Sequence, residues 1–380
     1  MKRTYKLCPA VALTVILFAG CDNAGYGTLE NSVYLSDASG TAKSATYTMD
    51  GDVDIVVNVR LAKKATKEVS AAIRLNAALI DRYNKAANSD YRPVPDLRLP
   101  EGERVTIPVG ETGVAYTIRV KDFNTDGKQY ALGVELGEVI TGNVPRSASQ
   151  SGFVYLLAKP LCVSVPVMSG RAGTVSAAPA ANWGLTVGEW SLECWARMSA
   201  YRINNQALFE TGSADHSIYI RYGDANRPFN YLQVKALGGQ VQTAPDLGNN
   251  KWYHWAFVYD GTTLTVFRNG EVTVKFDPPA PKGGLMRFDY MRMLTSGAHY
   301  FADECAVSQI RLWKRAIPQA QIKSNMYYTV TPTHPDLIGY WPMDEGDGSV
   351  FADITGNGHD ATARKGVVLR WEPDIRFDRR

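Results

Sequence analysis

Aromatic and polar side chains gather in loop-like stretches of the second half of the sequence, most densely in YGDANRPFNY, residues 222–231. Aromatic rings stack on apolar C–H faces, while arginine, carboxylate and amide groups hydrogen-bond hydroxyls. Together they are the chemistry of a carbohydrate site. The candidate glycan-binding residues are Asp215, His216, Tyr222, Asp224, Asn226, Arg227, Tyr231, His299 and Tyr300. The same chemistry recurs at Tyr201, Arg202, Asn204 and Asn205. Polar loops have this composition without binding anything, so each residue also has a purely structural interpretation.

A glycine-rich turn near the C-terminus, DITGNGHD, concentrates oxygen donors. Asp353 and Asn357 within it are the kind of ligand that a hard cation such as Ca²⁺ takes. The same side chains can instead cap the turn by hydrogen bonding to its backbone. Structural calcium is therefore the one candidate cofactor, because no cysteine or histidine spacing resembles a zinc site.

The acidic residues do not form a recognisable hydrolase motif. A retaining glycosidase needs two carboxylates about 5–5.5 Å apart, which same-face positions on one strand can supply. The clusters at 344–347 and 303–304 contain a glycine or lack this alternation, and none of the five histidines lies beside a nucleophilic serine or cysteine. No catalytic residue is predicted, and an enzyme is not expected.

The most clearly patterned element is the segment from Lys251 to Val274, KWYHWAFVYDGTTLTVFRNGEVTV. Three runs rich in aromatic and β-branched residues are separated by Asp260-Gly261 and Asn269-Gly270, dipeptides typical of type I′ turns. The segment is predicted to be a three-stranded meander. The first run, residues 252–259, is apolar almost throughout, which predicts a strand covered on both faces.

This hairpin resembles that of the laminin-G-like, concanavalin A-like lectin/glucanase superfamily. Other matching segments are GEWSLECWARM (188–198), DECAVSQIRLW (303–313), LIGYWPMDEG (337–346) and DITGNGHD (353–360). The resemblance implies a jelly roll of two antiparallel sheets over 161–380, a short helix over 318–327, and a core role for His254. It also implies that Asp303, with Asp353 and Asn357, is a candidate calcium ligand.

The stretch 22–160 contains short strand candidates at even spacing, such as residues 53–61 and 114–120, and one helical turn or two near 77–88. This pattern predicts an immunoglobulin-like β-sandwich. Together with NSVY (31–34) and DRYN (81–84), it resembles an N-terminal domain of unknown function in Bacteroidetes surface lipoproteins, including endo-N-acetylglucosaminidases. The resemblance implies a spacer that presents its partner domain.

Residues 1–21 have the features of a lipoprotein signal peptide. Lys2, Arg3 and Lys6 precede an apolar stretch, residues 7–19, that is shorter than the about 20 residues a membrane span needs. The following Gly20-Cys21 resembles a lipobox, although Phe18 departs from its usual leucine. Cys21 is the predicted lipid anchor; the alternative is an ordinary signal peptide with an incidental cysteine.

Composition excludes some classes of partner. The formal net charge is +3 over 380 residues and no basic run exceeds two residues, so nucleic acid is not an expected partner. Cys162, Cys194 and Cys305 are expected to be free, buried apolar residues.

The sequence thus predicts an all-β, lipid-anchored outer-membrane protein on the extracellular face, with a spacer sandwich and a lectin-like jelly roll. It is expected to capture a complex glycan, such as a host N-linked glycan, for a Sus-like uptake system and its transporter. Two alternatives stay open: a glycoside hydrolase with an unrecognised carboxylate pair, and a structural or adhesive surface protein that binds a protein partner.

Overall fold

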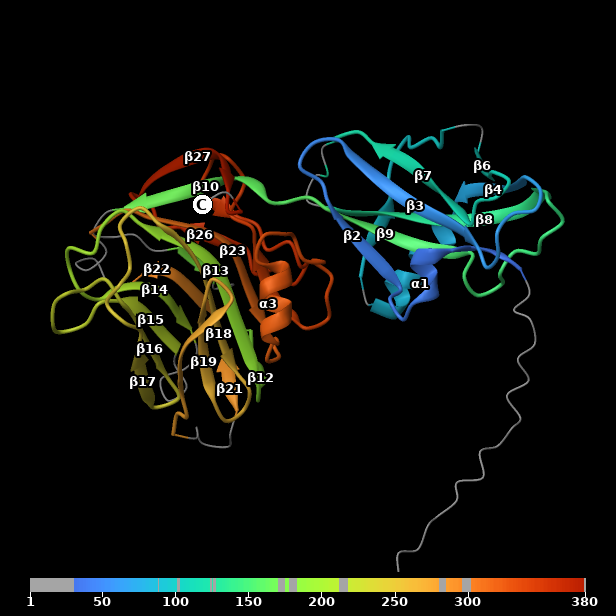
Figure 1. Cartoon of the computed structure of the whole chain (residues 1–380). Coiled ribbons are helices and arrows are strands. Elements are labelled where there is room, and N and C mark those ends of the chain that lie inside the picture. Colours follow the sequence, from blue (N-terminus) through green and yellow to red (C-terminus); the bar gives the residue numbers. More distant parts are fainter. Residues whose placement is uncertain are drawn as a thin grey trace, which may run out of the picture.

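A computed structural model describes residues 31–378 of the chain apart from 88, 101–102, 124, 126–127, 170–174, 178–182, 212–217, 280–284 and 296–301. Two bodies built almost entirely from strands lie side by side (Figure 1). The predicted all-β fold class is confirmed. Strand β9 (Gly152–Ala158) belongs to the first body and β10 (Cys162–Ser169) to the second, so the chain crosses between the bodies within a few residues.

The N-terminal domain is a β-sandwich of two sheets in the described part of the chain. One sheet has the strand order β1 (Val33–Leu35), β3 (Val53–Leu61), β7 (Gly113–Val120). The other has the order β2 (Ser44–Thr48), β9, β8 (Gln129–Thr141), β4 (Val69–Leu75), β6 (Arg104–Ile107), with β5 (Tyr91–Pro93) beside β8. Alternate residues of β3, from Ile55 to Leu61, are buried between the sheets, as the sequence alternation predicts.

Helix α1 (Ala77–Ala87) covers the outer face of the second sheet and is longer than the turn or two predicted. A 3₁₀ helix, η1 (Ser36–Ser39), follows β1. Ile80 of α1 is buried against Ala131, Val154 and Leu156 of β8 and β9. Gly133 on β8 allows this close approach, because a Cβ there would lie 2.3 Å from the carbonyl oxygen of Asn76 just before the helix.

The C-terminal domain is a jelly roll of two large antiparallel sheets. The first has the order β20 (Glu271–Phe276), β19 (Leu264–Arg268), β18 (Trp252–Tyr259), β13 (Trp190–Met198), β23 (Cys305–Trp313), β10, β27 (Val368–Arg376), with β24 (Leu337–Trp341) beside β23. The second has the order β17 (Gly239–Gln242), β16 (Leu232–Ala236), β15 (Ile218–Tyr222), β14 (Gln206–Thr211), β22 (Met291–Thr295), β11 (Val175–Ala177), β26 (Ala361–Ala363), β25 (Val350–Phe351). A small pair, β12 (Leu185–Val187) with β21 (Met286–Phe288), lies at one end.

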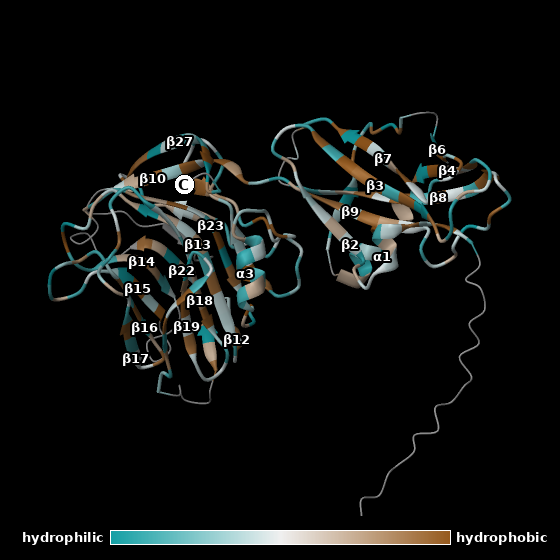
Figure 2. Cartoon of the chain, viewed as in Figure 1, coloured by the Kyte–Doolittle hydropathy of each residue, from teal (hydrophilic) through white to brown (hydrophobic). Residues whose placement is uncertain are grey.

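Strand β18 is covered on both faces, as its apolar sequence predicts. Trp255 and Phe257 point into the main core between the two large sheets. Ala256 and Val258 point the other way, into a second cluster with Ile322 of helix α3 (Gln319–Asn325). The apolar residues of these strands are brown in Figure 2.

The meander forms, but its two turns differ from each other. Asn269 and Gly270 both have positive φ (56° and 79°) and make the predicted two-residue turn between β19 and β20. The other connection is longer than predicted and spans 260–263 between β18 and β19. There Asp260 Oδ1 accepts the N–H groups of Thr262 and Thr263, at 3.0 and 2.8 Å, so the aspartate shapes an Asx turn.

The cysteines are free, as expected, but they differ in exposure. Cys194 and Cys305 are buried in the main core. Cys162, at the start of β10, is exposed, which corrects the expectation that all three are buried. Within the described residues, no helix has the length and apolar character needed to cross a membrane.

Candidate functional site

The loop between β15 and β16, residues 223–231, is the segment that the sequence singled out most strongly. Gly223 opens it with φ of +68°, and a Cβ at this position would lie 2.7 Å from Cβ of Phe229. The glycine is therefore required both by backbone conformation and by the close return of the loop. A cis peptide bond joins Arg227 to Pro228 at its tip.

The two tyrosines that bound this loop hold it in place. Tyr222 is 1% exposed and points into the core, where it contacts Tyr201 edge-on with ring centroids 5.5 Å apart. This corrects its prediction as a ligand-facing residue: Ile218, Ile220 and Tyr222 share the inner face of β15 because side chains alternate along a strand. Tyr231 is buried too, and its hydroxyl accepts the N–H of Asp224 at 2.8 Å.

Asp224 anchors the loop to the outer face of the second sheet. Its Oδ2 accepts a hydrogen bond from Gln233 Nε2 at 2.9 Å, and its Oδ1 lies 2.6 Å from Arg221 Nη2. The hydrogen bond from Gln233, and then the charge of Arg221, lower the pKa of Asp224. Asp224 is thus an ionised structural group, half-buried at the base of the loop.

Asn226 and Arg227, also predicted, are exposed at the loop tip. The Arg227 guanidinium lies over the ring of Phe229, 5.3 Å from its centroid. Arg227 and Phe229 form one side of a surface cleft of about 460 Å³. Residues from three loops line this loop cleft: Ala200, Tyr201, Arg202, Arg227, Pro228, Phe229, Asn230, Leu247 and Asn249.

Arg202, on the opposite loop, is held in the cleft by a buried carboxylate. Asp303 has a fully buried side chain, whereas the Arg202 side chain is 70% exposed. Asp303 Oδ1 accepts the Nε–H of Arg202, and Oδ2 accepts the backbone N–H of Arg202 and the Nε2 amide of Gln206, each at 2.9 Å. Asp303, a candidate calcium ligand, therefore already has protein donors at both oxygens.

Asp353 and Asn357, the other candidate calcium ligands, lie together in the C-terminal turn. Asp353 accepts hydrogen bonds from the backbone N–H groups of Tyr340 (3.0 Å), Thr355 (3.1 Å) and His359 (3.2 Å). Asn357 Nδ2 donates to the carbonyl oxygens of Leu337 and Ile338. These are the hydrogen bonds expected if Asp353 and Asn357 cap the turn, which is the alternative to calcium binding. Across the described part of the chain, no three His, Cys, Asp or Glu side chains cluster to hold a metal ion.

The structure does not place every predicted residue. Asp215, His216, His299, Tyr300 and the predicted lipid anchor Cys21 lie outside the described residues. Of the described candidates, Asn226 and Arg227 are exposed at the loop tip, Asp224 and Tyr231 support that loop, and Tyr222 lies beneath it. The cleft residues Phe229, Asn230, Leu247 and Asn249 were not predicted. Phe229 and Asn230 do lie within the aromatic and polar run, but nothing local in the sequence indicates that 247–249 reach the same place.

The outer face of β14, β15 and β16 beside the cleft carries a network of polar side chains. Arg221 Nε donates to Gln233 Oε1 at 2.8 Å and its Nη1 donates to Asn205 Oδ1 at 2.7 Å. The hydroxyl of Tyr219 donates to the same Asn205 oxygen at 2.9 Å. This network fixes the ends of the loops that leave the sheet. The sequence signal for its residues is the alternation in Ile218-Tyr-Ile-Arg-Tyr222, which places Tyr219 and Arg221 on the outer face.

Comparison with known proteins finds a family model that matches part of each domain. Residues 169–323 match the family model described as the concanavalin A-like lectin/glucanases superfamily. Residues 29–140 match a second model, described as an N-terminal domain. No curated protein matches the sequence.

Among solved structures, a protein from Bacteroides ovatus ATCC 8483, provisionally assigned as carbohydrate-binding, covers 90% of this chain over 99% of its own length. Its TM-score is 0.57 and its sequence identity 19%, so the two share a fold. A SAP-like pentraxin from Limulus polyphemus covers 55% of this chain and 94% of its own (TM-score 0.37, 10% identity). EndoBT-3987 of Bacteroides thetaiotamicron, solved with a Man5GlcNAc product, covers 33% of this chain and 30% of its own (TM-score 0.27, 20% identity).

Proposed function

We propose that the protein binds a carbohydrate in the loop cleft of its C-terminal domain, whose residues 169–323 match the model of the concanavalin A-like lectin/glucanases superfamily. The observation that carries this proposal is the pairing of two exposed arginines, Arg202 and Arg227, with the rings of Tyr201 and Phe229 around one concave surface. Arginines can hydrogen-bond adjacent hydroxyls while rings contact the C–H faces of a sugar.

Pre-organisation of the cleft supports binding. Arg202 is fixed by the buried Asp303, and the 223–231 loop is fixed by Asp224 and Tyr231. Side chains that are already ordered lose less conformational entropy when a ligand arrives. Asn230 and Asn249 add amide groups that can donate to and accept from hydroxyls.

The composition of the cleft favours binding over hydrolysis. Among the described residues that line it, none is Asp or Glu. Glycoside hydrolysis needs a carboxylate pair beside the bond that breaks. Asp303, directly behind Arg202, is fully buried and bonded to protein donors, so it does not present a free carboxylate to the cleft.

The wider proposal is a surface glycan-binding lipoprotein. Acylated Cys21 anchors the chain in the outer membrane, facing outward, and the N-terminal domain holds the lectin-like domain away from the lipid. The ligand is a complex glycan, with a host N-linked, mannose-rich glycan as the leading choice, passed to a Sus-like transporter. The sequence resemblance of the first domain to the N-terminal domains of endo-N-acetylglucosaminidases supports this choice of ligand, and the lipobox-like stretch supports the anchor.

A glycan array with residues 22–380, run with and without EDTA, tests this proposal. We expect binding to one glycan class and about tenfold weaker binding for Arg202→Ala and Arg227→Ala, the loss of roughly one charge-assisted hydrogen bond. Arg364→Ala, an exposed arginine elsewhere in the same domain, is the matched control. A blank array with folded protein, or unchanged binding by both cleft variants, would overturn it.

A further inference from the structure

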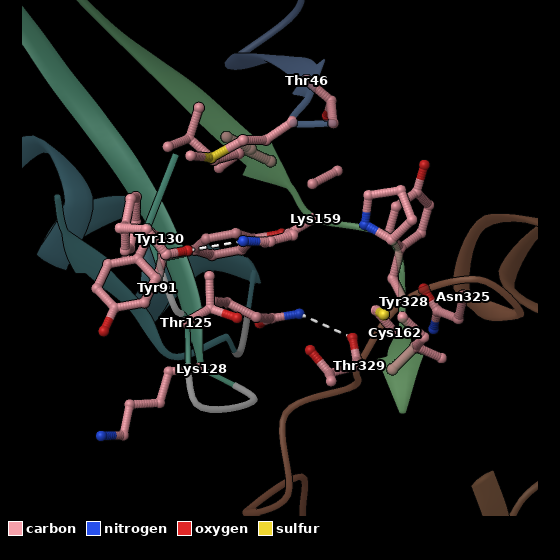
Figure 3. A pocket seen from close by; sticks show the side chains of 18 of the residues that line it. Thr46, Tyr91, Thr125, Lys128, Tyr130, Lys159, Cys162, Asn325, Tyr328 and Thr329 are labelled. Atoms are coloured by element: carbon pink, nitrogen blue, oxygen red, sulfur yellow. Dashed lines mark hydrogen bonds between the residues drawn. The ribbon is translucent and has the colours of Figure 1, made fainter. Parts of the chain in front are cut away.

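A second cavity lies between the two domains, remote in sequence from the loop cleft. Its volume is about 970 Å³, near the upper end of what small-molecule sites occupy. Figure 3 shows Tyr91, Lys128 and Tyr130 of the N-terminal domain on one side, facing Cys162, Asn325 and Tyr328 of the C-terminal domain on the other. Each domain therefore supplies part of the wall.

Polar contacts between the domains fix the width of this interdomain cavity. Gln129, at the start of β8, donates from Nε2 to the carbonyl oxygen of Thr329 at 3.1 Å, and its Oε1 accepts the hydroxyl of Thr331 at 3.1 Å. Arg376 of β27 forms an ion pair with Asp50 of the N-terminal domain, with 2.5 Å between Nη1 and Oδ1. A side-chain amide that is bonded in both directions holds the two domains at a defined separation.

Aromatic rings, together with aliphatic side chains such as those of Leu156 and Leu161, provide the apolar part of the lining. Tyr130 contacts Phe123 edge-on, with centroids 4.9 Å apart, and Tyr91 contacts Tyr83 in the same way at 5.9 Å. Tyr328 adds a ring from the C-terminal domain. Burial raises the pKa of Tyr91 to about 12, so its hydroxyl remains protonated and can donate a hydrogen bond.

The described charges around the cavity balance. Two lysines and two aspartates are among the described lining residues: Asp122, Lys128, Lys159 and Asp344. Lys159 is already bonded to Asp122 and to the carbonyl oxygen of Phe123, both at 2.7 Å. The remaining polar lining consists mainly of hydroxyls and amides, such as those of Thr125, Ser324 and Asn325. The balance of the described charges disfavours a phosphate ester. The mixture of hydroxyls, amides and aromatic rings suits a polyhydroxylated ligand, whose hydroxyls can be hydrogen-bonded while its C–H faces contact the rings.

We propose that the interdomain cavity is a second carbohydrate-binding site, which holds another part of a branched glycan or a second glycan chain. The ligand class rests on the proposed function, whereas the site itself rests on the geometry of the cavity. Because both domains contact the ligand, its binding stabilises the domain orientation set by Gln129.

Cys162 provides a chemical test of this proposal. It lines the cavity and is exposed, whereas Cys194 and Cys305 are buried. Alkylating residues 22–380 with N-ethylmaleimide therefore places a bulky group in the cavity while the buried thiols stay unreacted. Cys162→Ser, treated in the same way, is the matched control because the reagent has nothing to react with at that position. Tyr328→Ala and Tyr328→Phe provide a second comparison, since only the first removes the ring.

The experiment is one glycan array on these proteins and on Arg227→Ala, with each variant first shown to unfold at the wild-type midpoint. We expect alkylation and Tyr328→Ala each to lower the affinity for at least one glycan about tenfold, whereas alkylated Cys162→Ser and Tyr328→Phe should keep the wild-type affinity. Arg227→Ala should separately weaken binding through the loop cleft. If Arg227→Ala lowers glycan affinity and alkylation does not, the cavity proposal is overturned and the loop-cleft proposal stands. If alkylation lowers glycan affinity and Arg227→Ala does not, only the loop-cleft proposal is overturned. A blank array would overturn both proposals.

Discussion

Arg202 and Asp303 join an exposed guanidinium to a fully buried carboxylate at the edge of the loop cleft. The carboxylate accepts hydrogen bonds from both the backbone and the side chain of Arg202, and a third from Gln206. The side-chain amide oxygen of Gln206 in turn accepts the N–H of Asp303 at 2.8 Å. This arrangement orders one arginine of the cleft before any ligand arrives, and it explains why an aspartate expected from the sequence to be a metal ligand is buried.

Replacing Asp303 is therefore expected to affect both stability and binding. Asp303→Ala leaves Arg202 and Gln206 without their acceptor, and we expect a loss of about 3 kcal/mol in the free energy of unfolding. Glycan affinity should fall about tenfold because Arg202 is no longer held in place. Urea unfolding and calorimetric titration measure the two effects. Asp52→Ala, which breaks a surface pair with Arg119, is the control and should lower stability much less than Asp303→Ala.

Chelation separates the two interpretations of the C-terminal turn. Because Asp353 and Asn357 bond to the backbone around them, we expect EDTA to leave the thermal midpoint unchanged. A calcium ion at this turn would have to replace those hydrogen bonds. A midpoint that falls by several degrees in EDTA and recovers with added calcium would instead support the calcium interpretation.

The buried pair of Glu193 and Arg311 is expected to matter for folding of the second domain. Both side chains are 1% exposed, and Arg311 Nη1 lies 3.5 Å from Glu193 Oε1. Arg311 Nη2 also donates to the carbonyl oxygen of Tyr328 at 2.6 Å, which ties β23 to a wall of the interdomain cavity. Burial raises the pKa of Glu193, and the charge of Arg311 opposes that rise.

Arg311→Met should lower the free energy of unfolding by about 3–5 kcal/mol, because it leaves the buried carboxylate of Glu193 without its arginine partner. The double variant Glu193→Met/Arg311→Met removes both charges and should recover a large part of that loss. Urea unfolding of the three proteins gives the comparison. A single variant as stable as the wild type would show that the pair contributes little.

Local pattern predicts much of this structure. Strand β3 spans Val53–Leu61, the range predicted for it, because the period of two in its sequence directly reports one buried face. Asn269-Gly270 predicts its turn for an equally local reason, a backbone that needs positive φ. Asp260-Gly261 misleads because the aspartate side chain bonds to the backbone and stabilises a longer loop.

Relationships between distant residues were not predictable in the same way. Glu193 and Trp195 share the outer face of β13, which an isolated sheet would expose, yet both are buried because α3 and the chain after it cover that face. The partnership of Arg202 with Asp303 and the meeting of Gln129 with Thr329 depend on tertiary packing. The burial of Tyr222, by contrast, could have been predicted, because its position on β15 alternates in phase with Ile218 and Ile220.

Asp224 should make the second domain sensitive to acid. Its pKa is lowered by Gln233 and Arg221, so its stabilising contribution is present above the ordinary aspartate pKa of about 3.9 and is lost as pH falls through the lower folded value. Between pH 5 and pH 2, wild type should lose about 0.5–1 kcal/mol more unfolding free energy than Asp224→Asn, which has no charge to lose there. Asp54→Asn, exposed on β3, controls for the removal of one negative charge. Parallel acid profiles for wild type and Asp224→Asn would contradict this role.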